Sequence, residues 1–262
     1  MEPSWKLIAE IGSVGLVLIG LILLRGIRSR RARGASAAPG LAGGQPGLTR
    51  TQLWGLAAAA IFARRNNDGW DRLKLGASVE AVRAMLRESW NVHGPAEVEP
   101  TLDWLTGAGH TERLHQDLAA LAGVAPANVE AWLARQRPEA ARRLRFAQRH
   151  RTEFKDGKLV AWDLVRLINL ARALVTAGWL TETAAWKHLL PAARRLQREY
   201  RSWEDLSRNF MLGRHYWGEG EATQAKFDAA AAWLLSDPGS PWRRLAWTTP
   251  LDVAESSHGA RP

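Results

Sequence analysis

The sequence predicts an all-α fold. Three observations support this class: the helix formers Ala, Leu and Arg dominate, runs of β-branched residues are almost absent, and residues 159–217 contain three segments with helical periodicity. With 46% apolar residues in a chain of 262, a sizeable core is expected, as one large domain or two small ones. We expect a multi-helix globular domain, preceded by a single transmembrane helix and a flexible linker.

An apolar segment at residues 7–24 (LIAEIGSVGLVLIGLILL) predicts the transmembrane helix. A helix of this length covers about 27 Å, close to the ~30 Å hydrocarbon core of a bilayer. A cleaved signal peptide would carry positive charge before the apolar segment, where Lys6 is the only basic residue. We therefore expect residues 1–25 to form an uncleaved anchor.

Positive charge follows the apolar segment instead, at Arg25, Arg28, Arg30, Arg31 and Arg33. The positive-inside rule then places the amino terminus outside and everything after the anchor in the cytoplasm. These arginines also suit anionic headgroups, so we expect the lipid bilayer to be a partner. A nucleic-acid-binding arm is the less favoured alternative, because this short cluster supplies much of the net charge of +10.

The remaining boundaries follow from composition. Residues 26–50 are rich in Arg, Gly, Ala and Pro and predict a flexible linker. Residues 51–250 should form the helical domain, and the polar residues 251–262 a frayed tail. Cysteine is absent, which excludes disulfides and thiolate metal sites.

Start and stop signals divide the first half of the domain into short helices. We expect one helix over residues 51–65, followed by a turn at residues 66–69. Ser78 should cap a second helix that stops at residues 91–94. Further helices are expected to begin near Pro95, His110, Pro126 and Pro138.

The second half of the domain carries the longest clean helix. Residues 159–177 are apolar around most of the helix circumference, which predicts a central position, and Gly178 fits its end. Thr181 should cap the next helix, which Pro191 must kink or split. We then expect a helix capped by Ser202, in a sequence that resembles a capping box, with Gly213 allowing a close helix approach. A last helix is expected over residues 221–235, and an extended tail over residues 240–247 that packs by its tryptophans.

Six residues of this half form the candidate site: Trp162, Asp163, Arg166, Trp203, Arg214 and Trp217. Asp163 and Arg166 are i, i+3 neighbours on an apolar helix, so this pair should be partly buried and mutually satisfied. The favoured interpretation of the six is a core polar network packed by indoles. The alternative is a pocket in which the arginines hold an anionic group between tryptophans.

Motifs of common chemistries are missing from the sequence. It contains no Gly-rich phosphate loop and no nucleophile elbow, and His110 and His115 are five apart, off the spacing of four that aligns two metal ligands on a helix. We therefore predict no catalytic residue, no metal site and no cofactor. Arg142, Arg145 and Arg149 share one predicted helix face, for which a solvated surface is favoured over a phosphate-binding stripe.

Several tryptophan-centred segments resemble a known family. In order they are ESWNVHG (88–94), LDWLTGAGH (102–110), AWDLVR (161–166), GW (178–179), AW (185–186), SWEDL (202–206), GRHYW (213–217) and SPWRRLAW (240–247). Their order and spacing are similar to the bacterial family called domain of unknown function 1266, over roughly residues 51–250. The resemblance implies a helical bacterial domain with no established reaction, and it places all six candidate residues at motif positions.

Two functions remain open from the sequence. The favoured one is a non-enzymatic protein-interaction module held at the inner face of a bacterial cytoplasmic membrane, with a membrane or cytoplasmic protein as its partner. The alternative is an enzyme or binder of a small anionic ligand, with Arg166 and Arg214 as anion clamps. Nucleic acid is the least favoured partner.

Overall fold

The computed structural model describes residues 45, 47–218 and 221–251. The predicted transmembrane segment at residues 7–24, the arginine cluster, most of the predicted linker and nearly all of the predicted tail lie outside these residues. Within the described part of the chain, no helix is long and apolar enough to cross a bilayer.

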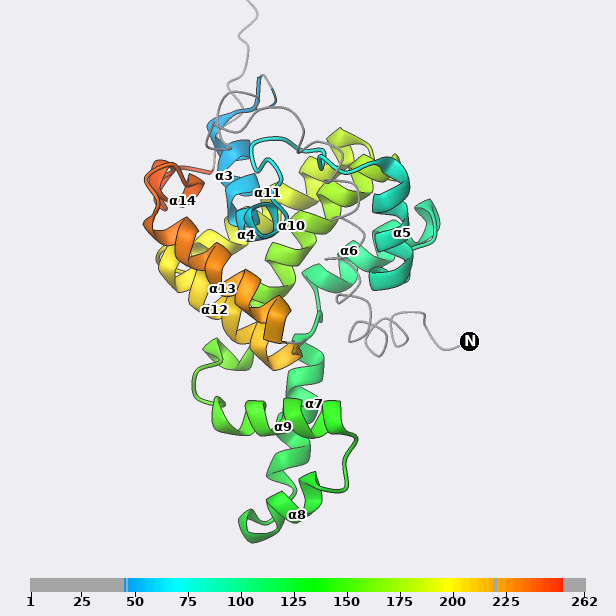
Figure 1. Ribbon diagram of the computed structural model, residues 1–262, viewed down its shortest axis with the longest axis vertical. Helices are drawn as coiled ribbons and strands as arrows, with labels where there is room; N and C mark the ends of the chain where they lie inside the picture. Colours follow the sequence, from blue (N-terminus) through cyan, green and yellow to red (C-terminus); the bar gives the residue numbers. More distant parts are fainter. Residues whose placement is uncertain (1–44, 46, 219–220, 252–262) are drawn as a thin grey trace, which may run out of the picture.

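Every regular element of the described residues is helical, which confirms the predicted all-α class. Element labels follow Figure 1. The helices are α3 (Arg50–Ala58), α4 (Ala60–Arg65), α5 (Val79–Trp90), α6 (Val98–Thr106), α7 (Thr111–Ala122), α8 (Val129–Leu133), α9 (Pro138–Arg149), α10 (Val160–Ala177), α11 (Glu182–Glu199), α12 (Trp203–Trp217), α13 (Glu221–Ser236) and α14 (Pro241–Arg244), with short 3₁₀ turns at η2 (Pro95–Glu97), η3 (Pro126–Asn128) and η4 (Lys155–Gly157).

Helix α10 is the centre of the main body, as its apolar sequence predicts. All of its residues except Asn169 and Thr176 are buried, because α3, α5, α6, α11 and α12 pack around it (Figure 1). Gly178 ends the helix with a φ of 76°, a left-handed conformation that glycine adopts without a Cβ clash. The predicted role of Gly178 is confirmed.

Helices α7, α8 and α9 form the lower end of the molecule in Figure 1. Their own small core contains Val129, Leu133 and Leu144. Helix α9 packs against α12 of the main body. Arg142 strengthens this junction by donating to the carbonyl oxygens of His215 and Trp217, at 3.2 and 2.8 Å.

The predicted helix starts are also confirmed. The hydroxyls of Ser78, Thr181 and Ser202 each accept a hydrogen bond from a backbone N–H three residues later, at 3.2–3.3 Å. The predicted capping box at Ser202 is only half formed, because the Asp205 carboxylate accepts from the N–H of Arg201, one residue before the cap. Aspartate is one methylene shorter than the usual glutamate.

Three predicted elements differ from the structure. The helix predicted over residues 51–65 breaks at Ala59, whose φ and ψ are −101° and 14°, and forms α3 and α4. Helix α11 continues through Pro191, so of the predicted kink or split the split does not occur. The buried face that includes Leu189 and Leu196 keeps the helix together around one missing donor. The tail is not extended at its start, because Ser240 and Pro241 supply a cap and a first helical residue for α14.

The predicted packing role of the tail tryptophans is confirmed. Trp242 stacks on Trp203 with ring centroids 5.6 Å apart, and Trp247 meets Trp54 and Trp203 edge-on at 5.1 and 4.9 Å. The Trp242 indole N–H donates to the carbonyl oxygen of Ala57 at 2.8 Å. The end of the described chain is therefore fastened to α3.

Gly213 brings α12 against α10, as predicted. A Cβ on Gly213 would lie 2.5 Å from the Cβ of Trp162, an atom that cannot move without the backbone of α10. Helix propensity favours Ala over Gly by about 1 kcal/mol, whereas overpacking a filled core costs about 1–3 kcal/mol. We expect Gly213→Ala to lower the melting temperature, measured by circular dichroism.

Gly123→Ala is the matched control. Gly123 is exposed, and the nearest atom to a methyl group added at this position would be the Ala120 carbonyl oxygen, at 3.5 Å. This variant should melt at or slightly above the wild-type temperature. A Gly213→Ala protein as stable as the wild type would show that the helices do not need this close approach.

Candidate functional site

A buried histidine joins the two charged residues predicted on α10. His110 directly precedes α7, and its Nδ1 lies 2.5 Å from Oδ1 of Asp163. Its Nε2 lies 2.8 Å from Nη1 of Arg166. Asp163 and Arg166 are each 4% exposed and His110 is 3% exposed. Burial is thus more complete than the sequence predicted, and His110 is a member that the prediction missed.

The hydrogen bonds fix the protonation of the imidazole. A guanidinium can only donate, so Nε2 of His110 must accept from Arg166. The proton of the neutral ring is then on Nδ1, where it is donated to the Asp163 carboxylate. Burial lowers the pKa of His110, the Arg166 charge lowers it further, and Asp163 acts in the opposite direction. A neutral imidazole therefore separates a buried anion from a buried cation.

Backbone geometry holds the Asp163 carboxylate in place. It accepts from the N–H of His110 at 3.1 and 3.0 Å. Gly109 has a φ of 50°, and a Cβ at this position would overlap the Asp163 carboxylate. Glycine is therefore required on two grounds, conformation and space.

Indole rings enclose this polar group. The ring centroid of His110 lies 4.5 Å from Trp217, 4.8 Å from Trp104 and 6.1 Å from Trp162. The guanidinium of Arg166 lies over the rings of Trp90 and Trp162, at 4.3 and 4.7 Å. An anion from solvent would have to displace this packing to reach Arg166.

The structure thus brings together four of the six predicted site residues: Trp162, Asp163, Arg166 and Trp217. Trp203 lies in the separate tryptophan cluster with Trp54, Trp242 and Trp247, and its indole N–H donates to the Leu245 carbonyl oxygen at 2.8 Å. Arg214 is fully buried, with its guanidinium 5.0 Å from the ring of Phe227. The six residues are all buried, as a core network predicts, but they do not form one cluster around His110.

A second buried network, which the sequence prediction missed, ties α7, α9 and α12 together. Asp117 is 4% exposed and accepts from Arg143 at 2.5 Å and from the Tyr216 hydroxyl at 2.9 Å. Burial raises the pKa of Tyr216, and the Asp117 charge raises it further, so the phenol stays protonated and donates. Arg142 donates to carbonyl oxygens of α12, and Arg145 donates to Glu130. These two arginines therefore do not form a phosphate-binding stripe with Arg149.

An accessible concave feature of the described residues lies elsewhere, between α9 and α12. This groove has a volume of about 910 Å³ and is open to solvent. Apolar, basic and acidic side chains line it: Phe146, His150, Glu153, Lys155, Arg201, Asp205, Arg208, Asn209, Met211, Leu212 and His215.

Aromatic rings form one wall of the α9–α12 groove. The Phe146 ring stacks on His150 at 4.2 Å and lies nearly parallel to His215 at 6.0 Å. Burial lowers the pKa of His215, so the neutral ring is favoured near neutral pH. This wall can accept an apolar or planar group.

The charges of the α9–α12 groove are unequally paired. Glu153 bonds to His150 at 2.6 Å, and Asp205 lies 3.8 Å from Arg208 and bonds to Asn209. Lys155 and Arg201 have no carboxylate within ion-pair distance among the described residues, and both are exposed. The unneutralised charge of the groove is therefore positive.

Comparison with known families agrees with the tryptophan-centred motifs. A family model described as a protein of unknown function, DUF1266, matches residues 85–247, which is more than half of the chain. The chain belongs to the DUF1266 family. The DUF1266 match begins inside α5, later than the predicted start at residue 51, although α3 and α4 share the same core. No curated protein and no solved structure matches the chain.

The protonation of His110 predicts how stability depends on pH. The pKa of His110 is lowered in the folded state, so the unfolded chain binds a proton first as the pH falls through about 6.5. The contribution of His110 to the free energy of unfolding is therefore complete above that pH. It is lost as the pH falls from there towards the lowered folded-state pKa.

We expect His110→Gln to remove this pH dependence, because an amide can donate to Asp163 and accept from Arg166 without titrating. The free energy of unfolding in urea, measured for both proteins between about pH 7 and pH 5, checks this expectation. An equal loss of stability in wild type and variant would contradict it.

Proposed function

We propose that this DUF1266 chain is a non-enzymatic interaction module, tethered to the inner face of a bacterial cytoplasmic membrane, that docks an acidic segment of a protein partner in the α9–α12 groove. The main support for this proposal is that the cations Lys155 and Arg201 of the groove are not neutralised by a carboxylate of the described residues. The two carboxylates of the groove are engaged, while these two cations have no carboxylate partner among the described residues.

The burial of the motif residues supports a module without catalysis. Asp163, His110 and Arg166 resemble a chemical site in composition, but the His110 imidazole bonds to both Asp163 and Arg166, and tryptophan rings lie against them. Removing one partner would leave a buried charge uncompensated, so these residues stabilise the fold. The family motifs therefore support a scaffold, and the binding surface lies on its outside.

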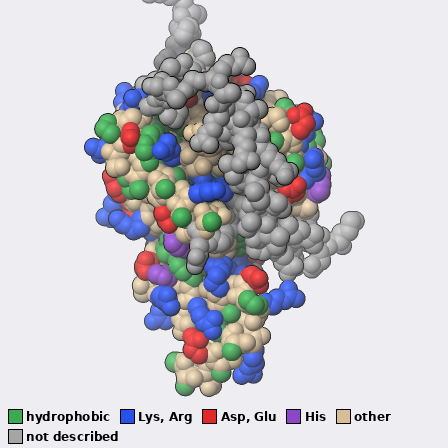
Figure 2. Space-filling model, viewed as in Figure 1, with side chains coloured by type: hydrophobic (Ala, Val, Ile, Leu, Met, Phe, Trp, Pro, Cys, Tyr) green, Lys and Arg blue, Asp and Glu red, His purple; other side chains and the backbone are tan. Residues whose placement is uncertain are grey.

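An acidic segment that also carries an apolar side chain fits the α9–α12 groove. Carboxylates would meet Lys155 and Arg201, and the apolar side chain would pack on Phe146, Met211 or Leu212. Figure 2 shows Lys and Arg side chains spread among acidic and apolar ones over the visible face. The visible part of this face does not favour the continuous phosphate contacts of nucleic-acid binding.

A small anionic ligand is the second candidate for the same groove. The observation that favours it is the parallel stacking of His150, Phe146 and His215, on which a planar group could lie beside the two exposed cations. This candidate replaces the predicted anion site at Arg166 and Arg214, which are 4% and 0% exposed.

Photo-crosslinking in cells tests the docking proposal. A benzophenone amino acid at Leu212 of the full chain should crosslink to a partner segment that mass spectrometry identifies as acidic and partly apolar. A synthetic peptide of that segment should bind wild type and lose on the order of tenfold affinity in the double variant Lys155→Glu, Arg201→Glu. Arg135→Glu, a charge reversal at an exposed residue just after α8 and outside the groove, should bind as wild type does.

Two outcomes would contradict the docking proposal. One is a crosslinked segment without acidic residues, and the other is equal binding by all three proteins. A thermal shift caused by ATP or citrate in wild type, absent from the double variant, would instead favour the small-ligand candidate.

Labelling of single introduced cysteines tests the membrane tether. Because the chain has none, a single Ser4→Cys or Ser36→Cys substitution introduces one thiol at a chosen side of residues 7–24. A membrane-impermeant maleimide added to spheroplasts should label Ser4→Cys and leave Ser36→Cys unlabelled until the cells are lysed. Labelling of both in intact spheroplasts, or recovery of the chain without membranes, would overturn the tether.

A further inference from the structure

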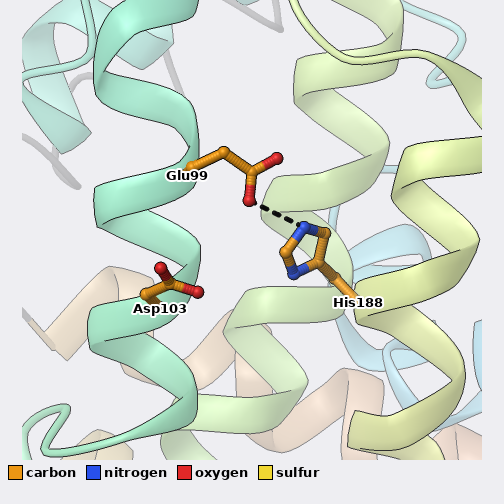
Figure 3. A group of neighbouring side chains, drawn as sticks. All are labelled: Glu99, Asp103 and His188. Atoms are coloured by element: carbon orange, nitrogen blue, oxygen red, sulfur yellow. Dashed lines mark ion pairs between the residues drawn. The ribbon is translucent and has the colours of Figure 1, made fainter.

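Helices α6 and α11 present three metal-binding side chains to one another. Glu99 and Asp103 lie one turn apart on α6, and His188 lies on α11 opposite them (Figure 3). Nε2 of His188 is 3.0 Å from Oε2 of Glu99. One donor atom from each of the three residues lies within 4.8 Å of the other two.

The donors come from separate parts of the chain. Glu99 and Asp103 are four residues apart, the spacing that places two side chains on one helix face. His188 is brought to them because α6 and α11 both pack on α10. A second hydrogen bond, from Arg195 to the Thr106 carbonyl oxygen at 2.8 Å, holds the two helices in this register. The packing of α6 and α11 therefore brings the three side chains together, and no single acidic segment of the sequence does.

Within the described residues, no Lys or Arg side chain neutralises the two carboxylates. In a chain with 36 Lys and Arg against 26 Asp and Glu, the Asp103 carboxylate has no hydrogen bond or ion pair in this part of the structure. Glu99 is paired there through His188 alone. Two carboxylates thus lie next to an imidazole nitrogen, and no cationic Lys or Arg side chain is paired with them in this part of the structure.

We propose that Glu99, Asp103 and His188 bind one divalent transition-metal ion, with Zn²⁺ as the best-suited ion. Two carboxylate oxygens and one imidazole nitrogen are a ligand set for Zn²⁺, Co²⁺ or Mn²⁺, while the nitrogen disfavours Ca²⁺ and Mg²⁺. The ion takes the place of the proton between His188 and Glu99.

The side chains have room to close on an ion. Ligand atoms held at about 2.0–2.2 Å from Zn²⁺ lie roughly 3–3.5 Å apart, so donor atoms that now lie within 4.8 Å of one another need to close by at most about 1–2 Å. Glu99 and Asp103 are exposed and His188 is half-buried, so rotamer changes suffice. Three protein ligands leave coordination positions for water, and the bound ion would link α6 to α11.

Calorimetry on the full chain tests the site with the metal alone. Titration of ZnCl₂ into metal-free wild type should give one site per chain, and Co²⁺ should compete for it. Zn²⁺ should also raise the melting temperature, because the ion binds the folded arrangement of α6 and α11. Millimolar Ca²⁺ should leave both results unchanged.

Three variants and one control locate the ion. His188→Ala, Asp103→Asn and Glu99→Gln should each weaken Zn²⁺ binding by on the order of tenfold or more, with unchanged circular dichroism. His93→Gln removes an exposed histidine outside the trio and should bind as wild type does. Absence of a wild-type site, or equal Zn²⁺ affinity in all five proteins, would overturn the proposal. The docking proposal for the α9–α12 groove does not depend on this result.

Discussion

The structure depends on placing opposite charges inside its most apolar helix. Asp163 and Arg166 project from α10 into a core where neither could stay ionised without compensation. His110 supplies that compensation with one ring nitrogen for each partner, and the Gly109 backbone opens the necessary space. The approach of α7 to α10, the closeness of α12 at Gly213 and the surrounding indoles are all consistent with protecting this arrangement. A third buried charge of α10, Arg172, is compensated by backbone carbonyls and by the Asp68 carboxylate at 3.9 Å. It donates to the carbonyl oxygens of Gly69 and Arg72, and burial lowers its pKa to about 10.

Much of the local structure could be predicted from the sequence. The apolar circumference of α10, the Gly178 terminus and the Ser78, Thr181 and Ser202 caps are short-range signals, and each is confirmed. The break at Ala59 could not be predicted, because an Ala-rich sequence contains no stop signal and tertiary packing decides the matter. At Pro191 the local signal allowed a split, but the long buried face of α11 keeps the helix continuous.

In the candidate site, too, local spacing could be predicted from the sequence, whereas contacts between distant residues could not. The spacing of Asp163 and Arg166 on one helix predicts a direct pair, but the structure places the His110 imidazole between them. His110 is 53 residues from Asp163, and no local pattern connects the two. Its position at the end of LDWLTGAGH was the one available signal. Trp203 and Arg214 were grouped with them because they share the motif-rich half of the chain, yet Trp203 serves the junction with the tail. The α9–α12 groove and the α6–α11 trio are assembled from residues on separate elements. Neither surface is visible in any one segment of the sequence.

The position of His110 also determines how the molecule can come apart. The α7–α9 end has its own small core of Val129, Leu133 and Leu144, and by size alone it resembles a part that could open separately. However, His110 directly precedes α7, while its partners Asp163 and Arg166 lie in the centre of the main body. Detaching α7 would withdraw the imidazole and leave two charges unsolvated in the core. Asp117 adds a second such connection through Tyr216. The buried contacts of His110 and Asp117 therefore couple the stability of the lower end to that of the main body.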